Sequence, residues 1–300
     1  MAVVPPARRR TRLALAGLAV AALLAGCTPG EVDGFLQGTP EPTGVDERLA
    51  EMVPAAIRST GKLVVGTDAT YAPSEFLDDD GKTIIGFDVD LFNAVASKLG
   101  LKAEWTPAAF DEIIPGVRSG QFAVGVSSFS INNERLQQVN MVSYFRAGTQ
   151  WAAKTGSRIS AENACGKDIA VQADTVQISD LQSRSRRCTD SGKPAIRIHQ
   201  YRAQSDATAA VLSGKDDAML ADSPVCAYAV KQQDGRLATI GNIYDSAPYG
   251  YVLPKDQDEF ADAVASAVDQ LIVNGTYRTI AAKWGLGAGL ITDATVNPVL

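Results

Sequence analysis

The sequence predicts an α/β protein whose sheets are mostly parallel and whose chain folds into two lobes. From about residue 62, strand-like segments alternate with segments of helical periodicity. The alternation restarts after residue 154, which indicates two α/β units joined by two connecting strands. With 300 residues, 46% hydrophobic and 21% charged, the chain can bury a sizeable core. Two such units predict a cleft between the lobes.

Residues 1–27 are predicted to be a lipoprotein signal peptide. Four arginines within Arg8–Arg12 precede an apolar run of 14 residues, Leu13–Gly26, which is too short to span a bilayer comfortably. The run ends in small residues before Cys27, and this resembles the bacterial lipobox, in which the cysteine becomes the lipid-bearing N-terminus. A plain secretory peptide cut after Gly26 is the alternative. The export route, Sec or twin-arginine, stays open.

Residues 28–58 are predicted to be a flexible tether and lead-in. The segment 28–45 is rich in Pro, Gly and Thr, and 46–58 is expected to form a short amphipathic helix. Removing the four signal arginines from the 28 basic residues leaves 24 against 34 acidic residues, a net charge of −10. We therefore expect no nucleic acid partner, because binding phosphates requires clustered positive charge.

The first unit begins with a strand at Lys62–Asp68, followed by a loop and a hairpin turn at Asp80–Gly81. A helix at 88–100 repeats apolar residues at helical spacing, with Asp88 expected to cap it and Gly100 to end it. The unit continues with a strand at 101–107, a helix at 110–120 and a strand at 122–128.

The second unit repeats this order before two C-terminal helices. Its predicted elements are strands at 168–174, 195–201 and 216–222, helices at 175–185 and 205–214, and, after the segment 249–256, helices at 258–275 and 276–285. Cys165 and Cys188 flank one segment of this unit, and export to an oxidising compartment predicts a disulfide between them. Cys226 lies in an apolar helical context and is expected to be a buried free thiol.

Polar and aromatic side chains gather where the predicted strands end. In parallel α/β sheets, ligands bind beyond the carboxyl ends of the strands. The candidates at these ends are Asp68, Tyr71, Glu75, Phe110, Ser127, Ser128, Ser130, Arg135, Asp174, Thr175 and Asp222.

Arg135 is the most informative of these candidates. Asn132 is predicted to cap a new helix, so Arg135 lies in its first turn, where free N–H groups carry partial positive charge. Hydroxyls, N–H groups and a guanidinium suit a carboxylate, while Asp222 suits an ammonium group. Tyr71 and Phe110 offer apolar faces, so the set predicts a zwitterionic ligand. The residues alone also allow purely structural roles: the serines can form a turn, the aromatic rings can lie in the core, the arginine can pair with a neighbouring acid, and the aspartate can cap a helix.

Longer motifs resemble the family 3 extracellular solute-binding proteins, the polar amino acid receptors of ABC importers. They occur in family order over roughly residues 60–286 and read TDATYAPSEF, GFDVDLFNAVASKLG, FDEIIPGVRSGQFAVGVSSFSINNER, VQADTVQ, LADSP and NGTYRTIAAKWG. The resemblance implies a two-lobe periplasmic-binding-protein-like fold (type II), with two hinge strands and a ligand cleft between the lobes.

The resemblance also implies which residues bind the ligand's common groups. Arg135 stands where the family binds the α-carboxylate, with help from Ser130 and Thr175. Asp222 and Ser128 stand where the family binds the α-amino group.

Four more residues would surround the ligand side chain. Tyr71 and Phe110 stand where aromatic rings sandwich it, and Asp68 and Glu75 stand where selectivity is often set. Two acids favour a basic side chain, such as that of arginine or lysine. Either acid can also hydrogen-bond a neutral amide, so glutamine stays possible.

The chain departs from the family pattern at three positions. Gln172 and Ala221 stand where some glutamine-type members have a lysine and a histidine, and this weakens a glutamine assignment. Ala173 stands where the family often has glycine.

An enzyme is the competing prediction. Ser59–Lys62 matches S-x-x-K and Lys154–Gly156 matches K-T-G, both known from serine β-lactamases, but the first leads into a strand and no S-D-N follows. Nothing supports a catalytic triad around His199, the only histidine. Some proteins of this fold are dehydratases, so an enzyme acting on an amino-acid-like carboxylate stays open. We expect no cofactor and no metal site.

The resemblance implies the remaining organisation. Lobe 1 is expected at 59–147 and 250–290, lobe 2 with the hinge at 148–249, and a C-terminal tail at 291–300. Gly148 and the stretch 247–251 are hinge candidates. The expected partners are a polar amino acid and the ABC permease subunits in the membrane. We expect a monomer, exported and lipid-anchored to the outer face of the cell membrane through Cys27.

Overall fold

The computed structural model describes residues 44–299. The predicted signal peptide, Cys27 and the tether up to residue 43 lie outside the described residues. Within 44–299, no helix is both long enough and apolar enough to cross a bilayer.

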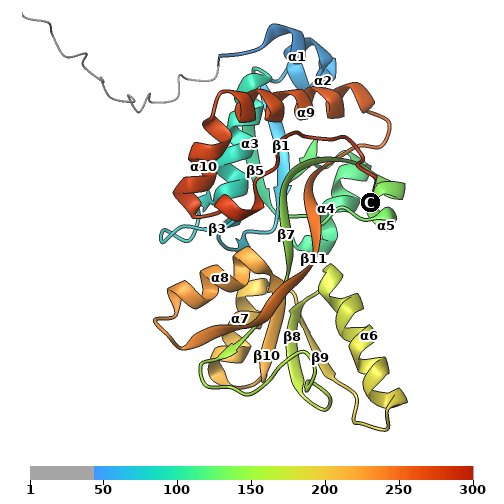
Figure 1. Cartoon of the computed structure of the whole chain (residues 1–300). Coiled ribbons are helices and arrows are strands. Elements are labelled where there is room, and N and C mark those ends of the chain that lie inside the picture. Colours follow the sequence, from blue (N-terminus) through green and yellow to red (C-terminus); the bar gives the residue numbers. More distant parts are fainter. Residues whose placement is uncertain (1–43, 300) are drawn as a thin grey trace, which may run out of the picture. The chain divides into compact units, whose positions relative to one another are not determined.

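A mixed sheet of eight strands organises the described chain, in the order β5-β1-β6-β11-β7-β10-β8-β9 (Figure 1). Its strands are β1 (Lys62–Thr67), β5 (Lys102–Pro107), β6 (Val124–Gly125), β7 (Asn140–Lys154), β8 (Asp168–Gln172), β9 (Arg197–Tyr201), β10 (Ala218–Asp222) and β11 (Leu237–Leu253). The outer strands on each side are parallel to one another, whereas β7 and β11 pair antiparallel in the centre. The predicted α/β class with two connecting strands is therefore confirmed.

The long strands β7 and β11 run through both lobes. Their pairing shifts register between Ile240 and Tyr244, between Tyr244 and Ala247, and between Tyr249 and Gly250. A Cβ atom at Gly148 would lie 2.7 Å from the carbonyl oxygen of Tyr244, so the strands can approach this closely only at a glycine. The predicted lobe boundaries fall inside these two strands, and the residue limits of the lobes stay a prediction.

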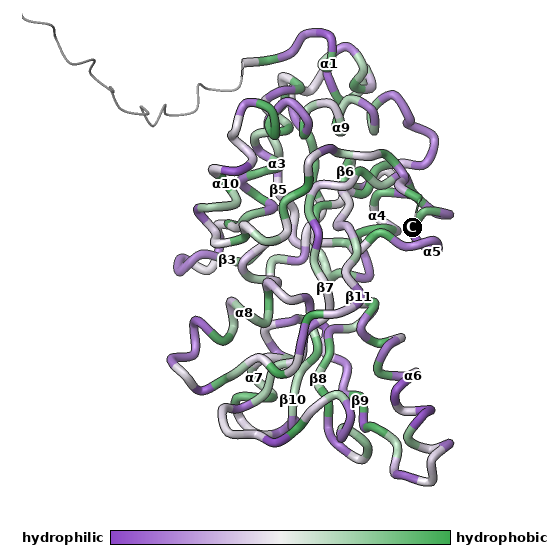
Figure 2. The backbone as a smooth tube through the Cα atoms, in the orientation of Figure 1, coloured by the Kyte–Doolittle hydropathy of each residue, from purple (hydrophilic) through white to green (hydrophobic). Residues whose placement is uncertain are grey.

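Helices cover both faces of the sheet. Lobe 1 carries α1 (Glu47–Met52), α2 (Ala55–Arg58), α3 (Phe87–Lys98), α4 (Phe110–Ser119), α5 (Asn133–Gln138), α9 (Asp258–Val273), α10 (Thr276–Trp284) and the 3-10 turn η1 (Gly287–Gly289). Lobe 2 carries α6 (Val176–Asp190), α7 (Gln204–Ser213) and α8 (Ser223–Gln232). Apolar residues of α3 and α9 pack on β1 and β7 in the lobe 1 core, whereas α6 is largely hydrophilic (Figure 2).

Three local predictions differ from the structure. The expected loop after β1 contains a small antiparallel sheet of β2 (Thr70–Tyr71), β3 (Glu75–Leu77) and β4 (Ile84–Ile85). The single lead-in helix is instead two helices, α1 and α2, separated at Pro54. The prediction that Asp88 caps α3 is wrong: Gly86 is the cap residue, with a φ of 142°, and Asp88 lies inside the helix and is buried.

Both cysteine predictions are confirmed. Cys165 and Cys188 form a disulfide that ties the start of lobe 2 to α6. Cys226 is a buried free thiol whose Sγ lies 3.3 Å from the carbonyl oxygen of Gln150. Away from these cysteines, the C-terminal tail packs on lobe 1, since Val296 forms a bridge with Val142.

Candidate ligand-binding site

A cavity lies between the two lobes, at the strand ends where the sequence placed its polar residues. Both lobes supply its walls. The lining residues are Asp68, Tyr71, Phe110, Ser127, Ser128, Ser130 and Arg135 from lobe 1, and Gln172, Thr175, Val176, Gln177 and Asp222 from lobe 2. Eight of the nine residues predicted to bind ligand therefore line one cavity.

Arg135 is a buried cation without an acidic partner. Asn132 caps α5 as predicted, because its Oδ1 accepts the Arg135 backbone N–H at 2.8 Å. The Arg135 guanidinium donates to the backbone carbonyls of Ser130 at 2.8 Å and, across the cleft, of Asp174 at 3.2 Å. No ion pair of Arg135 exists within residues 44–299. Burial lowers the pKa of Arg135 to about 10, which leaves it charged at neutral pH.

Aromatic rings flank the Arg135 guanidinium. Its Cζ atom lies 5.4 Å from the ring centroid of Phe110 and 5.3 Å from that of Phe129, and these two rings stack on each other. Cation–π attraction offsets part of the cost of burying this charge. Phe110 therefore faces both the cavity and Arg135.

Asp222 is a buried acid held by three neutral donors. The hydroxyls of Tyr71 and Tyr249 each donate to Oδ2 at 2.8 Å, and the amide of Gln177 donates to Oδ1 at 2.8 Å. The bond from Tyr71 crosses the cleft, because Tyr71 belongs to lobe 1 and Asp222 ends β10 in lobe 2. Burial raises the pKa of Asp222 above its ordinary value.

Asp68 is the second acid that lines the cavity. Its carboxylate accepts from the hydroxyl of Thr70 at 2.7 Å and, across the cleft, from the amide of Gln172 at 2.8 Å. Its backbone N–H donates to Oγ of Ser127 at 3.1 Å. The pKa of Asp68 is also raised by burial.

Glu75 does not line the cavity. It is fully buried behind the two serines that do, and Oγ of Ser127 donates to its Oε1 at 3.0 Å. Burial and the neighbouring Asp88 raise the pKa of Glu75 well above its usual range, which favours its neutral form. Its predicted role in ligand selectivity stays a prediction.

Sequence reasoning did not assign several residues that the structure brings to this site. Gln172 was noted only as a departure from the family pattern, and Ser127 only as a strand-end residue. Gln177 lies in the first turn of α6, two residues beyond Thr175, so the rule about strand ends could have found it. Tyr249 comes from the long strand β11, and no local pattern marks it.

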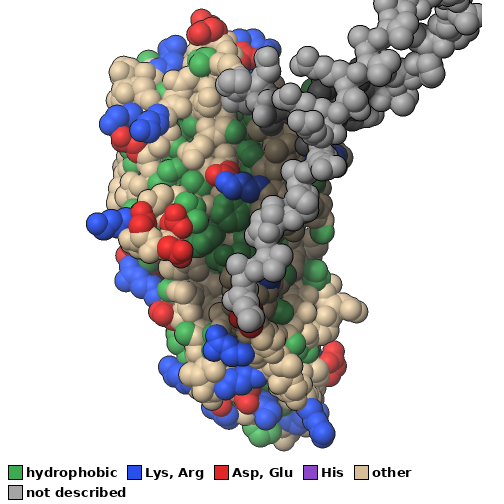
Figure 3. Space-filling view, turned by 90° about the vertical axis from the view of Figure 1, so that its left-hand side faces the viewer, with side chains coloured by type: hydrophobic (Ala, Val, Ile, Leu, Met, Phe, Trp, Pro, Cys, Tyr) green, Lys and Arg blue, Asp and Glu red, His purple; other side chains and the backbone are tan. Residues whose placement is uncertain are grey.

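Two other features are distinct from this cavity. Figure 3 shows hydrophobic side chains gathered on the face that carries α8 and α10, where a wide groove is lined by Tyr228, Trp284 and Leu286. None of the described residues that line this groove is an acid, so it offers no carboxylate to an ammonium group.

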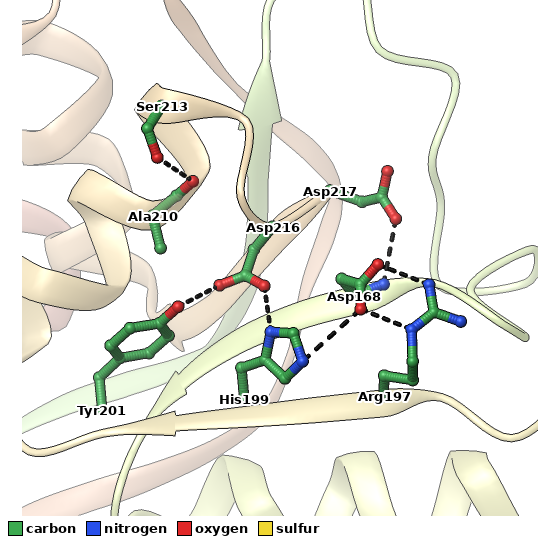
Figure 4. A network of polar contacts seen from close by, with 8 residues as sticks. All are labelled: Asp168, Arg197, His199, Tyr201, Ala210, Ser213, Asp216 and Asp217. Carbon is green, nitrogen blue, oxygen red and sulfur yellow. Dashed lines mark hydrogen bonds and ion pairs between the residues drawn. The ribbon is translucent and has the colours of Figure 1, made fainter.

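His199 lies on β9 between Asp168 and Asp216, in a polar network that does not reach the cavity (Figure 4). Within 44–299, no cluster of three or more His, Cys, Asp or Glu is placed to hold a metal ion.

A family model matches residues 63–287, which is most of the chain, and its description is bacterial extracellular solute-binding proteins, family 3. The chain belongs to this family. The arginine-binding protein ArgT of Corynebacterium glutamicum is 37% identical over 271 residues, covering 89% of this chain and 88% of that protein. Solved structures of relatives agree with the fold.

Two such structures are informative. An ancestral arginine-binding protein bound to arginine is 33% identical, with a TM-score of 0.70, covering 75% of this chain and 98% of that one. An ancestral amino acid-binding protein described as a precursor of cyclohexadienyl dehydratase is 31% identical, with a TM-score of 0.69, covering 76% and 97%. The two-lobe solute-binding fold predicted from the motifs is confirmed.

Proposed function

We propose that this solute-binding protein captures a basic L-amino acid, L-arginine before L-lysine, and delivers it to the permease of an ABC importer. One observation carries the proposal: a single unpaired cation, Arg135, and two acids, Asp68 and Asp222, face one small cavity. The complement of that charge pattern is a molecule with one anionic and two cationic groups. Arginine and lysine have this pattern at neutral pH, whereas glutamine lacks the second cation.

The anionic end of the ligand would bind Arg135. A guanidinium presents N–H groups in a planar fork that fits a carboxylate through two parallel hydrogen bonds. Ser130 and Thr175 line the same cavity, and the Ser130 hydroxyl can donate to the same group, whereas the Thr175 hydroxyl donates to the Gln172 carbonyl at 2.8 Å in the ligand-free protein. A carboxylate there would compensate a buried positive charge that the described protein leaves without an acid.

The two cationic ends would bind Asp222 and Asp68. Asp222 stands where the family binds the α-amino group, and an ammonium would replace neutral donors with a charged one. Asp68, beside Gln172, would accept from the far end of the side chain. A neutral amide can also donate to Asp68, but it leaves the negative charge of Asp68 uncompensated.

The names of the relatives support this choice. ArgT of Corynebacterium glutamicum is an arginine-binding protein, and the ancestral protein with the same fold was solved with arginine bound. The likeness to a precursor of a dehydratase keeps an enzyme of the same fold as the second candidate. We propose that the chain is no enzyme, because the lining residues already match the charges of an unreacted amino acid.

We propose that the protein is exported, lipid-anchored through Cys27 and monomeric, and that it passes its ligand to membrane permease subunits. Mass spectrometry of the membrane-extracted protein tests the anchor, since a diacylglyceryl group on Cys27 adds a defined mass. Crosslinking to the permease tests the partner.

Calorimetric titration of residues 44–300 with L-arginine and L-citrulline tests the ligand class. Citrulline has nearly the same shape as arginine but a neutral urea in place of the guanidinium. We expect arginine to bind at least about 30-fold more tightly, because an uncompensated buried charge costs about 2 kcal/mol or more. Equal affinities, or tighter binding of glutamine, would contradict the basic ligand. Consumption of the bound amino acid over time would favour the enzyme.

A further inference from the structure

Two buried carboxyl groups lie directly behind the serines that line the cavity. Glu75 belongs to β3 and Asp88 to α3, and both side chains are 0% exposed. Oγ of Ser128 lies 3.5 Å from Oε2 of Glu75 and 3.3 Å from Oδ2 of Asp88, so the two carboxyl groups are close neighbours. Two adjacent buried carboxyl groups disfavour the state in which both are ionised, so one of them is expected to keep its proton.

Asp88 holds Ser128 in place. Its Oδ2 accepts from the Ser128 backbone N–H at 3.1 Å and from the Ser128 hydroxyl at 3.3 Å, and the hydroxyl of Tyr144 donates to the same oxygen. Ser128 has a φ of 49°, in the left-handed region that favours glycine. The backbone hydrogen bond to Asp88 stabilises this conformation, which sets the direction of the Ser128 peptide at the cavity wall.

Glu75 holds Ser127 and, through it, the end of β1. The hydroxyl of Ser127 donates to Glu75 and accepts from the Asp68 backbone N–H at 3.1 Å. Asp68 and Ser127 both line the cavity. A change in the charge or position of Glu75 is therefore transmitted to the cavity wall through one hydroxyl.

A single shared proton would complete this arrangement, because Oδ1 of Asp88 is buried and has no hydrogen-bond partner among the described residues. The other groups near the pair are the hydroxyls of Tyr144, Tyr251 and Tyr277, the two serines and the Asp68 carboxylate. No Lys, Arg or His of residues 44–299 forms an ion pair with either acid, so two ionised carboxylates here would repel without compensation.

We propose that Glu75 and Asp88, sharing one proton, are positioning residues that hold Ser127 and Ser128 in the geometry that binds the ligand. This inference rests on the proposed function for its ligand, but not for its proton. The shared proton keeps the charge of the pair at −1. Its loss at alkaline pH places two charges in a buried site, displaces the serines and weakens ligand binding.

The first test is the pH dependence of affinity in Glu75→Gln. A glutamine amide donates to Asp88 at every pH, as the protonated glutamic acid does. The dissociation constant of Glu75→Gln should stay within about threefold of the wild-type value at pH 7. Between pH 7 and pH 10 the wild type should lose about tenfold more affinity than the variant. Comparing the two proteins with one ligand cancels the titration of the ligand, and Glu104→Gln, an exposed acid of the same lobe, is the control.

The second test is a double-mutant cycle between Asp88 and Ser128. In the protein that keeps Ser128, Asp88→Asn should weaken ligand binding about tenfold. In the Ser128→Gly protein the loss should be smaller, because glycine adopts a positive φ without a hydrogen bond to Asp88. Equal losses in the two backgrounds, or a wild-type pH profile in Glu75→Gln, would overturn the proposal. Thermal unfolding of each variant shows whether it is folded when its affinity is measured.

The third test needs no ligand and separates this inference from the proposed function. Carboxyl ¹³C signals of the ligand-free protein, assigned by their loss in Glu75→Gln, should show Glu75 protonated at pH 7. Ionised signals for both acids at pH 7 would refute the shared proton, whatever the protein binds. If the wild type prefers a neutral amino acid, the basic ligand is wrong, and the cycle is measured with that amino acid. If the wild type binds no amino acid, the inference is decided by the carboxyl ¹³C signals and the backbone amide signal of Ser128.

Discussion

Arg135 and Arg197 show two ways in which one protein treats a guanidinium. Arg197 is more than half exposed and pairs with Asp168 through two hydrogen bonds, of 2.6 Å from Nε and 2.5 Å from Nη2. The same aspartate lies 3.6 Å from His199, in a polar network within lobe 2 (Figure 4). Arg135 is buried, and carbonyls and aromatic rings surround it without an acid. Matched charges need no ligand, whereas an unmatched buried one favours a ligand of opposite sign.

The energetic cost of the two arrangements differs in the same way. An exposed ion pair contributes about 0–1 kcal/mol to stability, so the Arg197 network is replaceable. An ion transferred to a protein interior loses several kcal/mol of hydration, and carbonyls return only part of it. A ligand carboxylate bound to Arg135 would recover more of this lost free energy than the carbonyls do. The following predictions test this contrast, from the largest expected effect to the smallest.

Replacing Arg135 should have the largest effect on binding. We expect Arg135→Ala to weaken the binding of every amino acid by about 100-fold or more, since breaking a buried charged pair costs about 3 kcal/mol or more. Arg197→Ala is the matched control and should change the dissociation constant less than about twofold. Calorimetric titration measures both. Unchanged affinity in Arg135→Ala would refute the carboxylate assignment.

Replacing Asp68 should remove preference but not binding. In Asp68→Asn the affinity for arginine should fall by about 30-fold, whereas the affinity for citrulline should change little, because the side chain of citrulline carries no positive charge. Asp168→Asn, at the paired arginine, should leave both affinities unchanged. An equal loss of affinity for the two ligands would indicate that Asp68 supports the fold of the cleft and does not recognise the ligand side chain.

Replacing Tyr249 should have a smaller effect. Tyr249→Phe removes one of three neutral donors to Asp222 and leaves the ring in the core. We expect arginine to bind about five- to tenfold more weakly, in line with about 1–1.5 kcal/mol for one hydrogen bond. Tyr244→Phe, whose hydroxyl donates to Asp180 at the edge of lobe 2, is the control. Equal losses of affinity in the two variants would show that Tyr249 has no specific role in ligand binding.

The pH dependence of stability should have opposite signs in the two regions. Burial raises the pKa of Asp222 and of Asp68, and raises that of Asp88 to about 6, so the ligand-free folded state binds these protons more tightly than the unfolded state. Their contribution to stability therefore falls as pH rises above the ordinary aspartate range, and for Asp88 it falls through about 6. Hydrogen bonds from Arg197 lower the pKa of Asp168, so its contribution is lost as pH falls below the ordinary aspartate range.

Thermal unfolding of the ligand-free protein measures this difference. We expect the midpoint to be a few degrees higher near pH 5 than near pH 8, and the slope above pH 6 to flatten in Glu75→Gln. Asp168→Asn should leave that slope unchanged. A midpoint that rises steadily from pH 5 to pH 8 would contradict the buried acids.

The sequence located most of the residues that line the cavity, because they lie at or near strand ends. Arg135, Asp68 and Asp222 follow directly from the rule that ligands bind there, and the structure brings them to one cavity. Glu75 could not be placed, because its position in a short strand whose side chains alternate does not tell which side faces the cleft. Asp88 resembled a helix cap, but the backbone N–H of Asp88 donates to the carbonyl of Ser74 and the helix begins after Gly86, which no local pattern shows. Tyr249 was missed because it reaches Asp222 through the pairing of two long strands.

The most direct test of the central claim compares L-arginine with agmatine, which is arginine without its carboxylate, in the wild type and in Arg135→Ala. If Arg135 binds the ligand carboxylate, titration of the wild type should favour arginine by about 100-fold or more, and the preference should nearly vanish in the variant. Equal binding of the two compounds by the wild type, or a preference that survives the loss of Arg135, would contradict the claim.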